Sequence, residues 1–214
     1  MNSRVEHGVA SDDRAWLLRA LLVLQSPVAV FAAMRDDSDG PARARQEPIT
    51  ALVLLAGIAS LLWAPTVGTL MDDPARDGVV VAILAFIVGG LYGALAYWLA
   101  GALLYWPARA LGGPGSYRRA RHIVGFAAAP LALSLLIWPV RISVYGSDVF
   151  RSGGSDTGTG DHVFAVLALV ALAWSIGLLA LGTRVVHRWG WARTVATVAP
   201  LTAAAGAIAY LFAR

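Results

Sequence analysis

The chain consists of long uncharged stretches separated by short charged ones. Five of the stretches reach the length of about 20 helical residues that crosses a hydrocarbon core about 30 Å thick. They are Pro48–Met71, Gly78–Ala108, His122–Val140, His162–Thr183 and Thr194–Ala213. The alternation of apolar and polar residues with a period of two, which marks membrane strands, is absent. The pattern therefore predicts an all-α, polytopic membrane protein with five transmembrane helices.

The second stretch, Gly78–Ala108, is much longer than one crossing needs. As a helix it would span about 46 Å, whereas two crossings would need about 40 residues, so we expect one long, tilted helix. Pro107 and the turn Gly112–Gly115 are expected to end it. We do not interpret this turn as a phosphate-binding loop, because no Lys-Ser/Thr pair follows it and no predicted strand precedes it.

The N-terminal residues have a different pattern. The uncharged run Ala20–Met34 is too short to cross a bilayer and has polar residues in its middle. Asp12 and Asp13 disfavour a signal peptide. We expect instead two short amphipathic helices at the inner membrane surface, the first starting near Ser11 and the second with Ser26 as N-cap and Pro27 as its first residue. Their apolar positions are Trp16, Leu17, Leu21 and Leu24 in the first helix and Val28, Phe31 and Ala32 in the second.

Two polar segments are expected to lack regular structure. The linker Asp36–Glu47 should be flexible, and Arg151–Asp161, rich in Gly, Ser and Thr, should form a mobile outer loop. The chain thus divides into a cytoplasmic N-terminal region, residues 1–47, and a five-helix transmembrane domain, residues 48–214.

The arginines predict the orientation in the membrane, because cytoplasmic loops are enriched in basic residues. The loops Pro107–Arg121 and Arg184–Arg193 together contain seven arginines and no acid. The alternate loops, Met71–Gly78 and Arg141–Asp161, contain three arginines and six aspartates. This bias places the N-terminus on the cytoplasmic side of the cell membrane and, with five crossings, the C-terminus outside.

The composition supports a membrane protein and narrows the possible activities. Of the 214 residues, 58% are hydrophobic and only 14% are charged, whereas an average soluble domain has about 25% charged residues. A soluble enzyme, a disordered chain and a disulfide scaffold are thereby excluded, the last because Cys is absent. All 17 basic residues are arginine, which we attribute to compositional bias, and no nucleic-acid partner is expected.

Candidate chemistry is sparse. The four histidines form no metal-binding spacing, so we assign no metal, cofactor or catalytic residue. Asp161, next to His162, is expected to cap a helix, and His122 to lie at the membrane interface. No Asp, Glu, Lys or Arg lies within the five stretches, whereas transporters and intramembrane hydrolases place such groups there. An enzyme is therefore not expected.

Small residues recur every four positions in three of the stretches, which would place them on one helix face and allow close packing. The pattern of Gly89 and Gly93 predicts that the second helix packs closely against the first. Pro130, Pro139 and Pro200 are expected to bend the third and fifth helices. The three stripes are Ala56, Ser60, Ala64 and Gly68; Ala85, Gly89 and Gly93; and Ala199, Ala203 and Ala207.

Three short motifs resemble a known family. The run Ser26-Pro27-Val-Ala-Val-Phe31 resembles the Ser-Pro-x-x-x-Phe element before the first span of bacterial Yip1-domain proteins. Leu111–Arg119 resembles their Gly-rich loop, and Val124–Pro130 their third span. The resemblance implies a five-helix membrane protein whose eukaryotic relatives bind Rab GTPases in vesicle traffic. That activity is not carried over, because only Asp39-Gly40-Pro41 remains of their acidic Asp-Leu-Tyr-Gly-Pro-type motif.

Two functions are compatible with these patterns. The leading hypothesis is a non-enzymatic scaffold or partner-binding membrane subunit, whose Arg-rich cytoplasmic face meets anionic lipid headgroups, a protein partner or a second copy of the chain. The alternative is a transporter or channel for a small molecule, ion or lipid. It would need a continuous polar path between kinked helices, lined by Ser60, Thr66, Ser134, Ser175, Thr197 and Thr202.

Overall fold

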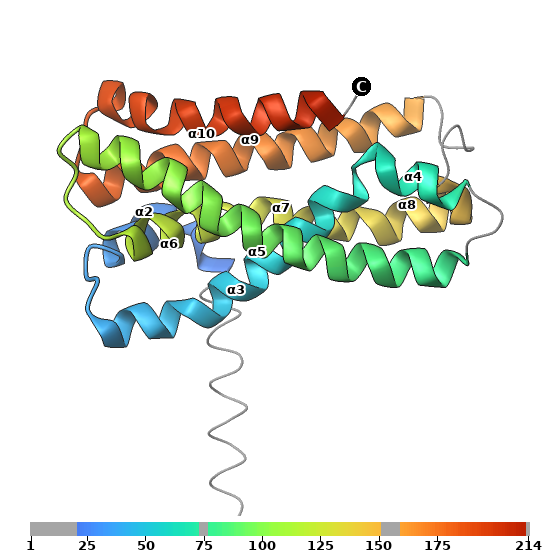
Figure 1. Cartoon of the computed structure of the whole chain (residues 1–214), viewed down its shortest axis with the longest axis horizontal. Coiled ribbons are helices and arrows are strands. Elements are labelled where there is room, and N and C mark those ends of the chain that lie inside the picture. Colours follow the sequence, from blue (N-terminus) through green and yellow to red (C-terminus); the bar gives the residue numbers. More distant parts are fainter. Residues whose placement is uncertain (1–20, 73–76, 151–158, 213–214) are drawn as a thin grey trace, which may run out of the picture.

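The computed structural model describes residues 21–72, 77–150 and 159–212, and the described part is a bundle of helices (Figure 1). Residues 21–25 are helical, and the expected start of that helix near Ser11 lies outside the described residues. The remaining elements are α2 (Pro27–Ala33), α3 (Asp39–Leu62), α4 (Pro65–Met71), α5 (Gly78–Ala110), α6 (Tyr117–Ala127), α7 (Ala129–Leu133), η1 (Ser134–Leu136), α8 (Ile137–Tyr145), η2 (Gly146–Phe150), α9 (Thr159–His187) and α10 (Trp191–Phe212).

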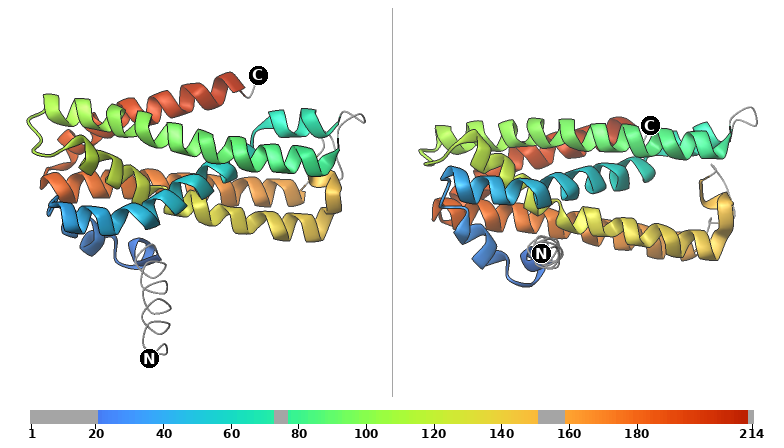
Figure 2. Two further views of the ribbon diagram at one scale, coloured as in Figure 1. Left: turned by 60° about the horizontal axis from the view of Figure 1, so that its bottom comes forward. Right: turned by 90° about the horizontal axis from the view of Figure 1, so that it is seen from below.

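The long helices lie roughly along one common axis (Figures 1 and 2). Four helical runs of the described part are long and apolar enough to cross a membrane, namely Asp39–Leu62, Val79–Ala110, Tyr117–Tyr145 and Gly160–His187. They correspond to the first four expected spans. The fifth expected span falls on α10, which is not among the four and packs against α5 and α9.

The first span differs from the expectation at both ends. The helix begins at Asp39, so most of the segment expected to be a flexible linker is helical, and Pro48 lies inside the helix. Arg45 stabilises the turn that precedes this helix by donating to the carbonyls of Ala33 and Asp36, at 2.9 and 2.7 Å. The helix ends near Ala64, whose extended backbone is the conformation that a following proline favours. Pro65 then starts the separate helix α4.

The second span is one long helix, as expected. It begins at Asp77, whose carboxylate accepts a hydrogen bond from the N–H of Val79 at 2.8 Å. Pro107 does not end it, because its missing N–H removes only one bond from the last turns, and α5 continues to Ala110. Gly112, with φ of 78°, then turns the chain, in keeping with the expected glycine-rich turn.

The third span is bent, as its prolines predict. A turn at Ala128 precedes Pro130, and the 3₁₀ turn η1 precedes Pro139, so α6, α7, η1 and α8 together form the crossing. It begins at Tyr117 and ends at Tyr145, which is longer than expected and brings Arg141 into the helix.

Helices α3 and α5 are in backbone contact. A Cβ atom added to Gly89 would lie 2.7 Å from the Cα of Ile58, and one added to Gly57 or Gly93 would overlap the backbone of the opposite helix. The close packing expected of Gly89 and Gly93 is therefore present. The expected partner stripe on α3 is wrong, because Gly57 and Val53 make this contact, whereas Ala64 lies at the end of the helix.

The N-terminal helices contribute to the core. Helix α2 begins at Pro27 as expected, although Ser26 makes no side-chain cap hydrogen bond. Phe31 is fully buried, and a Cβ atom on Gly182 of α9 would lie 2.7 Å from its ring. Phe31 therefore packs against the bundle, whereas Val28, expected on the same apolar face, is 55% exposed. By contrast, the third stripe is wrong as a packing face, because Ala199, Ala203 and Ala207 of α10 are all exposed.

Candidate functional site at the arginine-rich end

The two ends of the bundle differ in charge. One end, hereafter the basic end, is formed by the start of α3, the turn between α5 and α6, and the turn between α9 and α10 (left in Figure 1). At the opposite end, which we call the outer end after the side of the membrane expected for it, the described residues contain one arginine, Arg141, and four aspartates. The basic end carries the acids Asp36, Asp37, Asp39 and Glu47 and the arginines Arg35, Arg43, Arg45, Arg109, Arg118, Arg119, Arg121, Arg184, Arg188 and Arg193.

Asp37 connects the segment before α3 to the start of α6. Its carboxylate accepts a hydrogen bond from the Ser116 hydroxyl and one from Nε of Arg118 at 3.2 Å. Nε of Arg119 lies 3.9 Å from the same carboxylate, and Arg118 also donates to the Asp37 carbonyl and, at 2.8 Å, to Asp39. We call Asp37, Ser116, Arg118 and Arg119 the Asp37 clasp. Because its members are distant in sequence, the clasp fixes the glycine-rich turn against the N-terminal segment.

Arg35 extends this network to α9. Its Nε and Nη2 atoms donate to the carbonyl of Val185 at 3.1 and 2.7 Å. That carbonyl lies in the last turn of α9, where a helix has unsatisfied acceptors and a partial negative charge. Arg119 in turn donates to the carbonyl of Arg35 at 3.0 Å. Several arginines of the basic end therefore hold the protein's own backbone in place.

Asp36 is exposed in the turn before α3. The hydroxyl and N–H of Ser38 donate to its carboxylate, at 2.6 and 3.0 Å, and they hold the pKa of Asp36 below its usual value. The turn before α3 is thus stabilised by the ionised form of Asp36.

A second cluster combines cations with aromatic rings. The guanidinium of Arg121 lies 3.7 Å from the centre of the Trp98 ring and 5.0 Å from that of Tyr117. The hydroxyl of Tyr117 donates to the Trp98 carbonyl at 2.7 Å. Arg184 lies over Trp191 in the same way, at 4.6 Å. Such amphipathic rings are enriched at membrane–water interfaces, so the basic end has the composition of a membrane surface.

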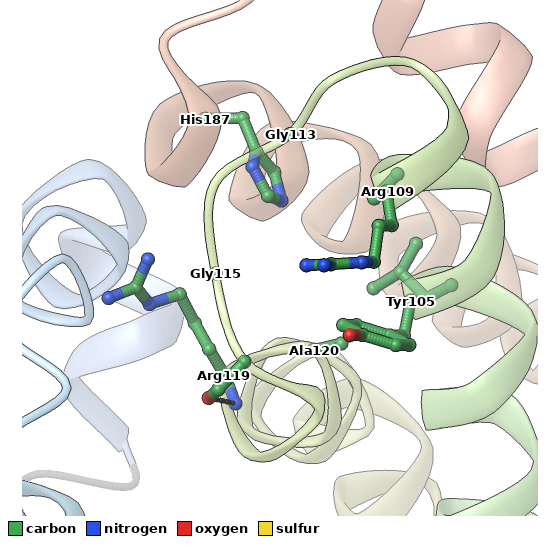
Figure 3. A pocket seen from close by; sticks show the side chains of 10 residues that line it. Tyr105, Arg109, Gly113, Gly115, Arg119, Ala120 and His187 are labelled. Atoms are coloured by element: carbon green, nitrogen blue, oxygen red, sulfur yellow. Dashed lines mark hydrogen bonds between the residues drawn. The ribbon is translucent and has the colours of Figure 1, made fainter.

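A shallow pocket lies behind the glycine-rich turn (Figure 3). Arg109 points into it above the ring of Tyr105, His187 points into it from α9, and Arg119 extends toward the N-terminal helices. The free volume of ≈ 10 Å³ is about that of one water molecule. The residues that line the pocket include two arginines, a histidine and two hydroxyls but no carboxylate, which suits contact with an anion.

His122 lies near the start of α6, the end of the span at which it was expected, and only 1% of its surface is exposed. Helix α6 turns Ile123, Phe126 and Ala127 into the core, and His122 lies on the same buried side. In the described ranges, no three His, Cys, Asp or Glu side chains come together as metal ligands.

Four of the six hydroxyls proposed for a polar path bond within their own helices, whereas the hydroxyl of Ser175 has no hydrogen-bond partner among the described residues. Ser60 donates to the carbonyl of Ala56 at 2.8 Å, and Ser134 to that of Leu131 at 2.7 Å. Thr197 and Thr202 donate in the same way, to Arg193 and Ala199. Ser175 is buried, and the side chain of Thr66 lies outside the described ones. These contacts follow the usual behaviour of helical Ser and Thr, and the described hydroxyls of this set do not line the pocket behind the glycine-rich turn or the larger cavity at the outer end.

Sequence reasoning missed the Asp37 clasp, because it treated the acids before Pro48 as a linker. One signal was present: the segment Asp36–Glu47 contains four acids, whereas the charged residues of the loop that contains Ser116 are all arginines. Opposite charges on two segments of one membrane face are natural partners. Nothing in the spacing indicates, however, which acid meets which arginine.

Comparison with known proteins gives one match. The model of the Yip1 domain family matches residues 21–213, which is nearly the whole chain. No curated protein and no solved structure matches it.

Proposed function

The chain belongs to the Yip1 family, and from this premise we propose that it is a non-enzymatic scaffold of the cytoplasmic membrane. In this proposal the basic end is its working surface, which binds anionic lipid headgroups and an acidic partner. The observation that carries the proposal is that the arginines of that end fall into two groups. Some fix the protein's own backbone, and others are left exposed around them.

The exposed group is well placed for binding. Arg43, Arg109, Arg188 and Arg193 are exposed and come from four different positions around the basic end. Near an anionic membrane surface, each arginine contributes about 1 kcal/mol of attraction. Since the Asp37 clasp holds the underlying turns in place, these charges need little reordering on binding, which lowers the entropic cost.

The same charge asymmetry supports the topology. The basic end is assigned to the cytoplasm, together with residues 1–47, by the enrichment of arginine on that side. Helix α10 is assigned as the fifth crossing, because it has 22 residues and, after Arg193, no charged residue in its described length. Five crossings place the C-terminus outside. The packing of Phe31 supports a docked N-terminal segment rather than one that only rests on the membrane.

Lipid binding at the basic end can be tested by native mass spectrometry of the detergent-solubilised protein. Phosphatidylglycerol and phosphatidylcholine with the same acyl chains are offered together. We expect the parent to retain phosphatidylglycerol in preference, and the triple variant Arg43→Gln, Arg109→Gln, Arg193→Gln to lose most of that preference. A variant with the same change in the expected outer loop, Arg151→Gln, serves as control. An unchanged preference in the triple variant would contradict the proposal.

Binding of a protein partner at the basic end is tested with the same variants. The protein is cross-linked in membranes, purified, and its co-purifying proteins are compared between parent and triple variant. A partner that is bound through the basic end should be depleted in the triple variant and retained in Arg151→Gln.

A further inference from the structure

A second cavity lies at the outer end, far from the surface proposed above. It has a volume of ≈ 390 Å³, in the range of small-ligand sites. The break between α3 and α4 at Ala64 forms one wall, and α8, η2 and the first turns of α9 form the others (Figure 1, right). Because α4 starts anew at Pro65, α3 does not continue straight along α8, and the space stays open.

The cavity has an aromatic wall. Trp63 and Trp138 contact each other with ring centres 5.3 Å apart, and Phe150 stacks on Trp138 at the same distance. The indole N–H groups of Trp63 and Trp138 have no hydrogen-bond acceptor among the described residues. Both nitrogens are buried, so the wall offers a ligand the faces of its rings rather than its N–H groups.

An ion pair forms the polar edge of the cavity. Nη2 of Arg141 lies 3.1 Å from the carboxylate of Asp161, and the guanidinium lies 4.8 and 4.9 Å from the ring centres of Trp63 and Trp138. Asp161 is in the first turn of α9, which begins at Thr159, and so it is not the cap that was expected. The side chain of Arg141 is 5% exposed, whereas that of Asp161 is 41% exposed. The carboxylate therefore faces outward and the guanidinium inward, beside the rings.

We propose that this cavity binds the headgroup of a zwitterionic phospholipid that carries a primary amine and a phosphate. A ligand with only negative charge meets the carboxylate of Asp161 first, and one with only positive charge is repelled by Arg141. A zwitterion satisfies both, with its amine at Asp161 and its phosphate toward Arg141. The proposal is independent of the function proposed for the basic end.

The surroundings favour a membrane lipid over a soluble zwitterion of the same chemistry. Val140 and Val144 on α8 and Val163 on α9 flank the ion pair and are more than half exposed. In helices that cross the membrane, such apolar residues face lipid. Tryptophans, furthermore, mark the interfacial depth at which headgroups lie. A headgroup therefore reaches the cavity with its acyl chains along these valines.

The test fills the cavity and leaves both residues of the ion pair in the chain. Ala165 lines the cavity, whereas Ala173, two turns further along α9, is exposed outside it. The variants Ala165→Phe and Ala173→Phe thus add the same bulk inside and outside the site. Native mass spectrometry is performed with phosphatidylethanolamine and phosphatidylglycerol of identical acyl chains.

We expect the parent and Ala173→Phe to retain phosphatidylethanolamine, and Ala165→Phe to retain about tenfold less, which corresponds to about 1.4 kcal/mol. Phosphatidylglycerol bound at the basic end should not change with Ala165→Phe, which separates this test from that of the proposed function. Asp161→Asn should reduce phosphatidylethanolamine retention in a protein of unchanged size in solution. If Asp161→Asn does not fold, the comparison of the two phenylalanine variants decides alone. Equal phosphatidylethanolamine retention in both would overturn the proposal.

Glycerophosphoethanolamine identifies the source of the headgroup. It has the same amine and phosphate but no acyl chains. If it fails to displace the lipid at millimolar concentration, the assignment to a membrane lipid is supported. If it binds at micromolar concentration and is lost in Ala165→Phe, the lipid assignment is overturned in favour of a soluble zwitterion.

Discussion

The two ends of the bundle use arginine in opposite ways. At the basic end, arginines are numerous, and they donate to the protein's own carbonyls or remain exposed. At the outer end, Arg141 is buried between aromatic rings and paired with Asp161. Many solvated charges form a surface that attracts anions over a distance. A single buried charge instead holds neighbouring helices together and, where it borders a cavity, can contact a ligand there. The burial of the arginines therefore indicates the role of each end better than their number does.

The largest loss of stability is expected at the contact between the first two spans, α3 and α5. Gly89→Leu should lower the free energy of unfolding in detergent by about 3 kcal/mol, because the added side chain meets the backbone of Ile58. Gly90→Leu is the control, since a Cβ atom there would meet only a Leu54 methyl group at 3.7 Å. Thermal melting with size-exclusion chromatography measures both. A stable Gly89→Leu variant of altered oligomeric size would show that this face serves association between chains.

A smaller loss is expected from the buried cation at the outer end. Arg141→Met removes the ion pair and the contacts with Trp63 and Trp138, and we expect a loss of about 2 kcal/mol. The cost is below that of breaking a fully buried pair, because Asp161 remains partly in contact with water. Arg109→Met at the basic end should change stability by less than about 0.5 kcal/mol. Equal effects of the two variants in thermal melting would remove the contrast between the ends.

The Asp37 clasp should have a local effect. Asp37→Asn weakens the contacts with Ser116 and Arg118, and we expect faster hydrogen exchange in α2 and at the start of α6, by about tenfold. Asp39→Asn is the matched control, because its side chain is mostly exposed and pairs with Arg118. Unchanged exchange in Asp37→Asn would show that the other contacts of the N-terminal segment, such as the packing of Phe31 and the bonds from Arg35 to Val185, hold it without the clasp.

Local patterns predicted much of the fold. The single long second helix, the turn at Gly112, the bends near Pro130 and Pro139 and the start of α2 at Pro27 are confirmed, because each depends on the residues at that position. The end of α3 near Ala64 was equally readable, since a proline follows, but the uncharged stretch suggested one helix. Charge runs mark where helices leave the bilayer rather than where they begin, which explains the early start of α3 at Asp39.

The close packing of α5 on α3 was predictable from its glycines, but the residue pairs between distant segments were not. Gly57 is also a helix glycine that allows close packing, and only the crossing of α3 and α5 makes it, rather than Ala56 or Ser60, the partner of Gly89. The pairs Asp37 with Ser116 and Arg141 with Asp161 likewise depend on how the helices are arranged. The candidate sites at both ends are made of such pairs, so the sequence predicted their charges and not their geometry.

The most direct test of the account is the side of the membrane on which the basic end lies. The chain has no cysteine, so single cysteines can be placed at the exposed positions Arg193, at the basic end, and Asp72, at the outer end. Intact cells are treated with a membrane-impermeant maleimide, and opened cells serve as the control for reactivity. We predict that Asp72→Cys is labelled in intact cells and Arg193→Cys only after the cells are opened. Labelling of Arg193→Cys in intact cells, with protection of Asp72→Cys, would contradict a cytoplasmic basic end.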